Sequence, residues 1–213
     1  MEYATLIGDV ILSRKEPDQE KLLLNIGKAL EEVNRLLPAA QALTMTIGDE
    51  FQGAYGEMEK ALEATLLIRL VLGKQPELRM GLAWGRISAS DPEALPLGQS
   101  GPGWWNAREA IEKVKKLEKK RGWPRTLRTW IEDPEGRFDA LNAFLLCRDQ
   151  VLQGMDDKDR RIALGLFLGE SQRDLSRVLG IQQPTVSKRL TGGGAMALFR
   201  AHRLLSRAVP DVS

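Results

Sequence analysis

Two adjacent carboxylates, Asp49 and Glu50, follow Gly48 at the tip of an expected β-hairpin over residues 43–55. Glycine at the first central position suits a type II′ turn, whose twist matches that of the flanking strands. A tight turn does not need two acidic side chains, whereas Mg²⁺ and Ca²⁺ prefer hard oxygen ligands. The pattern therefore indicates either a divalent-cation site or a plain turn with solvated carboxylates.

A further carboxylate, Asp9, interrupts the apolar run 3–12, which is expected to form a buried strand. A carboxylate is costly to bury unless it is paired, hydrogen-bonded or bound to a metal ion. Asp9 is therefore a second candidate ligand for a cation.

The elements around these carboxylates follow the order strand, helix, strand, strand, helix, strand. This order predicts a ferredoxin-like βαββαβ palm, in which the first strand ends beside the hairpin tip. Asp9 and Asp49 would then converge, and two close carboxylates repel unless a cation lies between them or one takes up a proton. The sequence thus predicts a divalent-metal site, with Mg²⁺ as a candidate cofactor. The expected elements are a strand at 3–12, a helix at 18–37, the hairpin, a helix at 57–72, and one long strand or a bent pair at 78–90.

A polar segment with Pro and Gly, residues 132–136, is the best candidate for a domain boundary. Before it we expect a helix over 104–120 and a strand over 125–131, and after it every pattern is helical. The predicted class is α+β: a palm domain over 1–135 followed by an all-α domain over 136–213.

Residues 171–190 have the pattern of a helix-turn-helix. Gly180 turns the chain between two helices, and Pro184 suits the start of the second because that position needs no N–H donor. The alternative is an αα-corner in a helical core; we favour DNA binding because a glycine turn, apolar positions and a polar tip coincide. The expected apolar contacts are Leu175, Val178, Leu179, Ile181, Val186 and Leu190. The side chains expected to be exposed and to contact DNA are Gln182, Gln183, Thr185, Ser187, Lys188 and Arg189, since Gln and Arg can bond base edges and Ser, Thr and Lys suit phosphates.

Charge is unevenly distributed along the 213 residues, although the net charge is only +2. Residues 1–100 carry 15 acidic and 10 basic side chains, whereas 171–209 carry seven basic and one acidic, which indicates an anionic partner for the second part. One Cys and one His leave no Cys/His zinc site within the chain and fit a reducing cytoplasm. The sequence shows no signal peptide and no apolar run of membrane-spanning length, so we expect a cytoplasmic protein without a membrane partner.

The motifs Leu-Ile-Gly-Asp-Val-Ile-Leu-Ser-Arg from residue 6, Ile-Gly-Asp-Glu-Phe-Gln-Gly from residue 47 and Trp-Trp-Asn-Ala-Arg-Glu-Ala from residue 104 resemble the SatD family of bacterial proteins. The resemblance extends over about residues 3–210 and includes the helix-turn-helix. More distantly, Asp9 after an apolar strand and the Ile47–Phe51 motif resemble class III nucleotide cyclases and GGDEF cyclases.

The cyclase resemblance implies roles for five residues. It implies that Asp9, Asp49 and Glu50 hold metal ions that activate a nucleoside triphosphate. It also implies nucleotide contacts from Asn106 and Arg108, although Ala110 stands where class III cyclases carry Arg, four residues after the Asn.

Together these features support one principal function and two alternatives. The principal hypothesis is a DNA-binding regulator whose palm senses a metal ion or a nucleotide, with a second copy of the chain as partner because helix-turn-helix proteins usually read paired half-sites. The first alternative is a metal-dependent nucleotidyl cyclase or transferase acting on a nucleoside triphosphate. The second is a scaffold that docks a protein through its helices. Whether the chain is an enzyme stays open at this stage.

Overall fold

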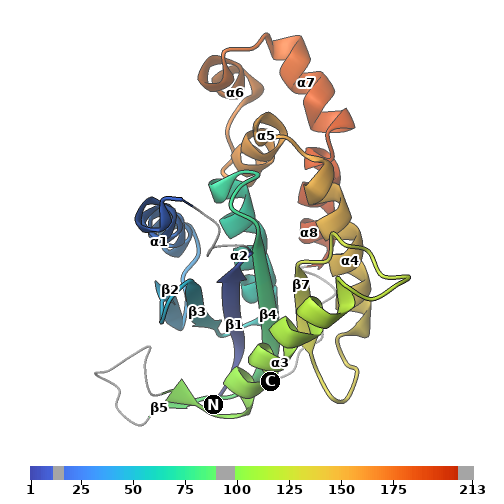
Figure 1. Cartoon of the computed structure of the whole chain (residues 1–213). Helices are drawn as coiled ribbons and strands as arrows, with labels where there is room; N and C mark the ends of the chain where they lie inside the picture. Colours follow the sequence, from blue (N-terminus) through green and yellow to red (C-terminus); the bar gives the residue numbers. More distant parts are fainter. Residues whose placement is uncertain (12–16, 90–98, 206–213) are drawn as a thin grey trace.

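A mixed sheet and eight helices make up the parts of the chain that the computed structural model describes, residues 1–11, 17–89 and 99–205. In these ranges five strands form the sheet in the order β2-β3-β1-β4-β7, and all neighbours are antiparallel except β4 and β7 (Figure 1). The predicted mixture of α and β structure is confirmed. The strands are β1 (Glu2–Val10), β2 (Gln41–Met45), β3 (Glu50–Tyr55), β4 (Leu78–Arg86) and β7 (Thr129–Glu132), with a separate pair β5 (Ser88–Ala89) and β6 (Gln99–Ser100).

The helices begin where the sequence offers capping groups. Asp18, Asp156 and Ser171 each accept a hydrogen bond from a backbone N–H in the first turn of the helix that they precede, which satisfies a donor that the helix leaves open. The helices are α1 (Gln19–Leu36), α2 (Met58–Leu72), α3 (Pro102–Leu117), α4 (Asp139–Gly154), α5 (Asp157–Phe167), α6 (Gln172–Leu179), α7 (Gln183–Gly192) and α8 (Ala195–Leu205).

Strand β1 shows how the sheet separates two cores. Leu6 and Val10 belong to the core with α1 and α2, whereas Ile7 packs with Trp104 and Ile111 of α3 on the other face. This alternation is the two-residue period of a strand buried on both sides. Asp9 shares the parity of Ile7 and therefore points to the α3 face.

The hairpin forms between β2 and β3, with Gly48 at a φ of +72° in its turn. The segment at 78–90 is a bent pair, β4 and then β5, as far as the described residues extend. The expected ends at 11–12 and 90 lie at or beyond the described ranges.

Helix α2 contributes side chains to two hydrophobic cores, the one on the sheet and the one among the later helices. Its Leu62 packs with the sheet, while Leu66 and Leu70 pack with helices α4 to α8. In the other direction, Leu141 and Leu145 of α4 reach into the core on the sheet. The domain division at residue 135 stays a prediction. Residues before and after it pack together in the same buried clusters.

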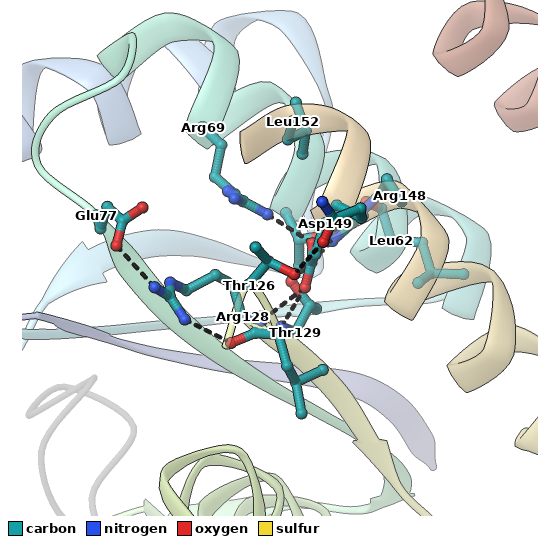
Figure 2. Close-up of polar contacts among 12 residues, drawn as sticks. Leu62, Arg69, Glu77, Thr126, Arg128, Thr129, Arg148, Asp149 and Leu152 are labelled. Atoms are coloured by element: carbon teal, nitrogen blue, oxygen red, sulfur yellow. Dashed lines mark hydrogen bonds and ion pairs between the residues drawn. The ribbon is translucent and has the colours of Figure 1, made fainter. Parts of the chain in front are cut away.

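A buried polar network holds α2, α4 and β7 together (Figure 2). The carboxylate of Asp149, which is 0% exposed, accepts hydrogen bonds from the Arg69 and Arg148 guanidiniums and from the backbone N–H groups of Arg128 and Thr129. Arg160 of α5 adds a second link, because it donates to backbone carbonyls of α2, of Gly73 and of α4. These bonds fix the position of the helical part on the sheet.

Candidate functional site

Helices α6 and α7 meet at a tight turn at the end of the molecule distant from β5 (Figure 1). Gly180 closes α6 in the left-handed conformation, with φ 62° and ψ 33°, which glycine adopts without a steric penalty. The Ser176 hydroxyl donates to the Ile181 carbonyl at 2.6 Å, and the Ile181 N–H returns to the Ser176 carbonyl at 3.2 Å. The turn is therefore fixed by three nearby residues, Ser176, Gly180 and Ile181.

Apolar side chains hold the two helices together. Leu175 of α6 and Val186 of α7 are 0% exposed, and Leu190 is 2% exposed. Leu179 and Ile181 are partly buried against the same cluster. The prediction that Val178 also contributes is wrong, because its side chain is 62% exposed.

The outer surface of α7 is polar and accessible. Pro184 lies in the first turn, and no side chain caps the helix. The N–H groups of Thr185 and Val186 donate to the Gln182 carbonyl, at 2.9 and 3.2 Å. Basic side chains Arg173 and Arg177 of α6 are also exposed, although Arg177 pairs with Asp174 at 3.1 Å. Five of the six predicted DNA-contacting residues are exposed: Gln182, Gln183, Thr185, Ser187 and Lys188.

Arg189 is the sixth, and its side chain is half-buried rather than exposed as predicted. Its contact with DNA stays a prediction. Its guanidinium bonds the carboxylates of Asp156 at 2.9 Å and Asp159 at 2.8 Å, both at the start of α5. These bonds, first the one with Asp159, raise the pKa of Arg189. Arg189 therefore anchors α7 to α5 and orients the other five side chains.

The carboxylates at the end of β1 and at the hairpin form a second group of polar residues. Asp9 lies opposite Glu50 in the β1–β3 register and is 7% exposed. The Lys115 ammonium lies 2.9 Å from Asp9 Oδ2, and the Arg79 guanidinium 3.7 Å from Oδ1. Two guanidinium nitrogens of Arg108 donate hydrogen bonds to the Glu50 carboxylate, Nη2 to Oε2 at 2.8 Å.

Protein cations thus neutralise two of the three predicted metal ligands. In the described ranges, no group of three or more His, Cys, Asp or Glu side chains is placed to hold a metal ion. Asp49 lies half-buried in the hairpin turn. Metal binding by Asp9, Asp49 and Glu50 stays a prediction. Nucleotide binding by Asn106 and Arg108 also stays a prediction. Of these two residues, Arg108 alone hydrogen-bonds a predicted metal ligand, Glu50, within the described residues.

Lys115 and Arg79 are the members of this group that the sequence analysis missed. Burial would lower the pKa of Lys115, but its bonds with Asp9 and Glu112 raise it above the usual value. The available signal was Asp9 itself, because a carboxylate in a central strand must be paired, hydrogen-bonded or bound to a metal ion. Nothing in the local sequence, however, says which cation supplies it.

The family comparison gives a match over almost the whole chain. The model of the SatD family (SatD) matches residues 3–207. No curated protein matches the chain. Within the described residues, every helix is too short or too polar to cross a membrane.

A solved structure, that of a bacterial light-regulated adenylyl cyclase, is 14% identical with a TM-score of 0.47. The match covers 62% of this chain and 43% of the cyclase chain, so this chain spans less than half the length of that protein. A similarity this low says nothing about activity. By its full-length family match, the chain belongs to the SatD family.

Proposed function

We propose that the chain is a DNA-binding regulator in which α6 and α7 act as a helix-turn-helix and α7 enters the major groove. The observation that carries the proposal is the row of five exposed polar side chains on a helix whose other side is pinned by Val186, Leu190 and Arg189. A reading helix needs this combination, because its side chains must be free while its axis is fixed.

The chemistry of the exposed row suits a duplex. Gln182 and Gln183 stand at the start of α7, where amide side chains can make paired hydrogen bonds to a base edge. Thr185, Ser187 and Lys188, all exposed, suit phosphate oxygens. The supporting scaffold would be a ferredoxin-like palm, since β2-β3-β1-β4 are antiparallel in the order expected for it. We propose a cytoplasmic homodimer that reads two half-sites one helical turn apart.

Salt dependence provides the first test. Binding of the full chain to short duplexes, measured by fluorescence anisotropy, should weaken steeply between about 50 and 200 mM salt, because phosphate contacts release counterions. Lys188→Ala should weaken binding to all duplexes and reduce the slope of log K against log salt by about 1. The matched control is Lys116→Ala, at another exposed lysine, on α3, which should change neither. An unchanged slope in Lys188→Ala would remove α7 from the interface.

A second proposal concerns cation binding at the end of β1, as needed for a palm that senses Mg²⁺ or a nucleotide. The favouring observation is that Asp9 Oδ1 is buried without a hydrogen-bond partner among the described residues, with the Arg79 guanidinium 3.7 Å away as an ion-pair partner. Since Lys115 occupies the other oxygen at 2.9 Å, the site as it stands does not present open Mg²⁺ ligands, and Mg²⁺ would have to displace the ammonium.

Titration calorimetry with Mg²⁺, with and without ATP, tests this second proposal. Lys115→Met should strengthen Mg²⁺ binding because the competing cation is gone, and Asp9→Asn should abolish it. Equal heats for the two variants would contradict a site at Asp9. The alternative function, a nucleotidyl cyclase or transferase, depends on the same Mg²⁺ binding and additionally requires turnover of a nucleoside triphosphate.

A further inference from the structure

An asparagine side chain binds the backbone of each outermost strand of the sheet. The outermost strands are β2 and β7, which lie at the two sides of the sheet (Figure 1). Such a strand presents backbone N–H and C=O groups that a strand of another molecule can bond. In this chain Asn34 of α1 binds these groups on β2, and Asn142 of α4 binds them on β7.

The two asparagines make the same pair of hydrogen bonds. Asn34 Oδ1 accepts from the Leu43 N–H at 2.8 Å, and its Nδ2 donates to the Leu43 carbonyl at 2.9 Å. Asn142 Oδ1 accepts from the Ile131 N–H at 2.8 Å, and its Nδ2 donates to the Ile131 carbonyl at 2.9 Å. A carboxamide carries the donor and the acceptor of a peptide group, and a residue of a neighbouring antiparallel strand bonds both groups in this way. Each asparagine therefore takes the place of one residue of a further strand.

The edge at β7 has a second closure on the same helix. The Asp149 carboxylate accepts from the Thr129 N–H at 2.8 Å. Thr129 lies two residues before Ile131, and the backbone groups of alternate residues point to the same side of a strand. Asn142 and Asp149 are 5% and 0% exposed. Helix α4 therefore covers this edge with two buried side chains.

The edge at β2 has less protection. Its sequence, Gln-Ala-Leu-Thr-Met, contains neither a charged residue nor a proline, which commonly protect an edge strand. Ala42 and Thr44, on either side of Leu43, are exposed. The remaining protections in the described part of the chain are a register shift against β3, between Gln41 and Thr44, and the half-buried Asn34. Asn34 binds Leu43 within the shifted interval, so the closure of this edge depends on one side chain.

We infer that Asn34 keeps the β2 edge closed to a second copy of this chain. With Asn34 in place, the Leu43 N–H and C=O are already bonded and a partner strand cannot use them. Without it, the β2 strands of two copies pair antiparallel about a two-fold axis, because such a contact uses the same surface on both copies. The proposed homodimer must then form through a surface other than the sheet edges. This role of Asn34 does not depend on DNA binding.

Replacing Asn34 with Ala in the full chain tests this role. The variant loses both bonds to Leu43 and gains a better helix former in α1. At low protein concentration, NMR should show the Leu43 amide exchanging its proton about tenfold faster than in the wild type, since a lost hydrogen bond changes an opening equilibrium by roughly that factor. In sedimentation velocity over a concentration series, the mass of the variant should reach at least double that of the wild type. Asn25→Ala, at an exposed asparagine of the same helix, should change neither quantity.

The double variant Asn34→Ala with Thr44→Lys separates strand pairing from unfolding. Thr44 is exposed on β2, and lysines there bring like charges together across two paired β2 strands. The double variant should therefore return to the mass of the wild type while its Leu43 amide still exchanges fast. Unchanged Leu43 exchange in Asn34→Ala, or a mass equal to that of the wild type, would overturn this role of Asn34. An enlarged mass that Thr44→Lys does not reduce would also overturn it, because the association would then come from another surface or from unfolded chains.

Discussion

Replacing Asp149 with Ala is expected to lower the free energy of unfolding by about 3–5 kcal/mol, because removing one partner from a buried ion pair leaves uncompensated charge in the core. Asp149 is the only carboxylate bonded to Arg69 and Arg148 among the described residues, and both guanidiniums are 5% exposed or less. Burial lowers the pKa of Arg148 to about 10, and the charge of Asp149 opposes this shift. The loss should be visible in urea unfolding followed by circular dichroism.

Exposed ion pairs provide the control for this measurement. Glu31 and Arg35 form a pair on α1 with both side chains mostly exposed, and such pairs contribute only about 0–1 kcal/mol. Glu31→Ala should therefore leave the unfolding midpoint almost unchanged. A loss below about 1 kcal/mol in Asp149→Ala would mean that water or a rearranged side chain replaces the carboxylate.

The buried network was not predictable from the sequence, although one signal was present. The sequence predicted helix α2 but not its environment: nearly all of its side chains from Leu62 to Leu70 are buried. The run of apolar residues around Arg69 was the signal, because a helix that is apolar on all sides is buried on all sides. Its partner Asp149 lies 80 residues away, and no local pattern identifies a contact at that distance.

Local features were predicted more successfully than side-chain orientation. The turn at Gly180 and the buried positions Leu175, Val186 and Leu190 follow from residues within one short stretch. Val178 lies three residues after Leu175, a spacing that also occurs between buried residues of a helix, and yet its side chain is 62% exposed. Arg189 was misjudged for a related reason: its acidic partners belong to α5, an element that the pattern of the stretch does not include.

The candidate site at the end of β1 shows the same limit. The sequence indicated that Asp9 must be paired, hydrogen-bonded or bound to a metal ion, and the register places it opposite Glu50. From the sequence alone, a metal ion and a lysine are equally suitable partners for the Asp9 carboxylate. The choice depends on where α3 crosses the sheet. The close passage of α3 over Gly81, where an added Cβ would lie 2.2 Å from the Ala107 carbonyl oxygen, is a tertiary feature.

The double variant Thr185→Glu with Lys188→Glu should lower DNA affinity at least about 100-fold, while the fold keeps its stability. Both side chains are exposed on α7, and two contacts of roughly 1–3 kcal/mol each are lost and replaced by repulsion from phosphates. Thr185 lies in the first turn of α7, where a carboxylate interacts favourably with the helix dipole by about 0.3–1 kcal/mol. Anisotropy titrations should be paired with thermal melts of the same samples.

The double variant should lower DNA affinity without lowering the melting temperature, and this difference makes the experiment decisive. A loss of DNA binding by unfolding would be accompanied by a lower melting temperature, whereas the dipole term predicts an unchanged or slightly higher one. Lys116→Glu on α3 adds negative charge at an exposed position away from α7 and separates the effect of net charge from that of the contact surface. If this control weakened DNA binding as much as the double variant, the interface would have to include α3, and the row of exposed side chains on α7 would lose its role as the reading surface.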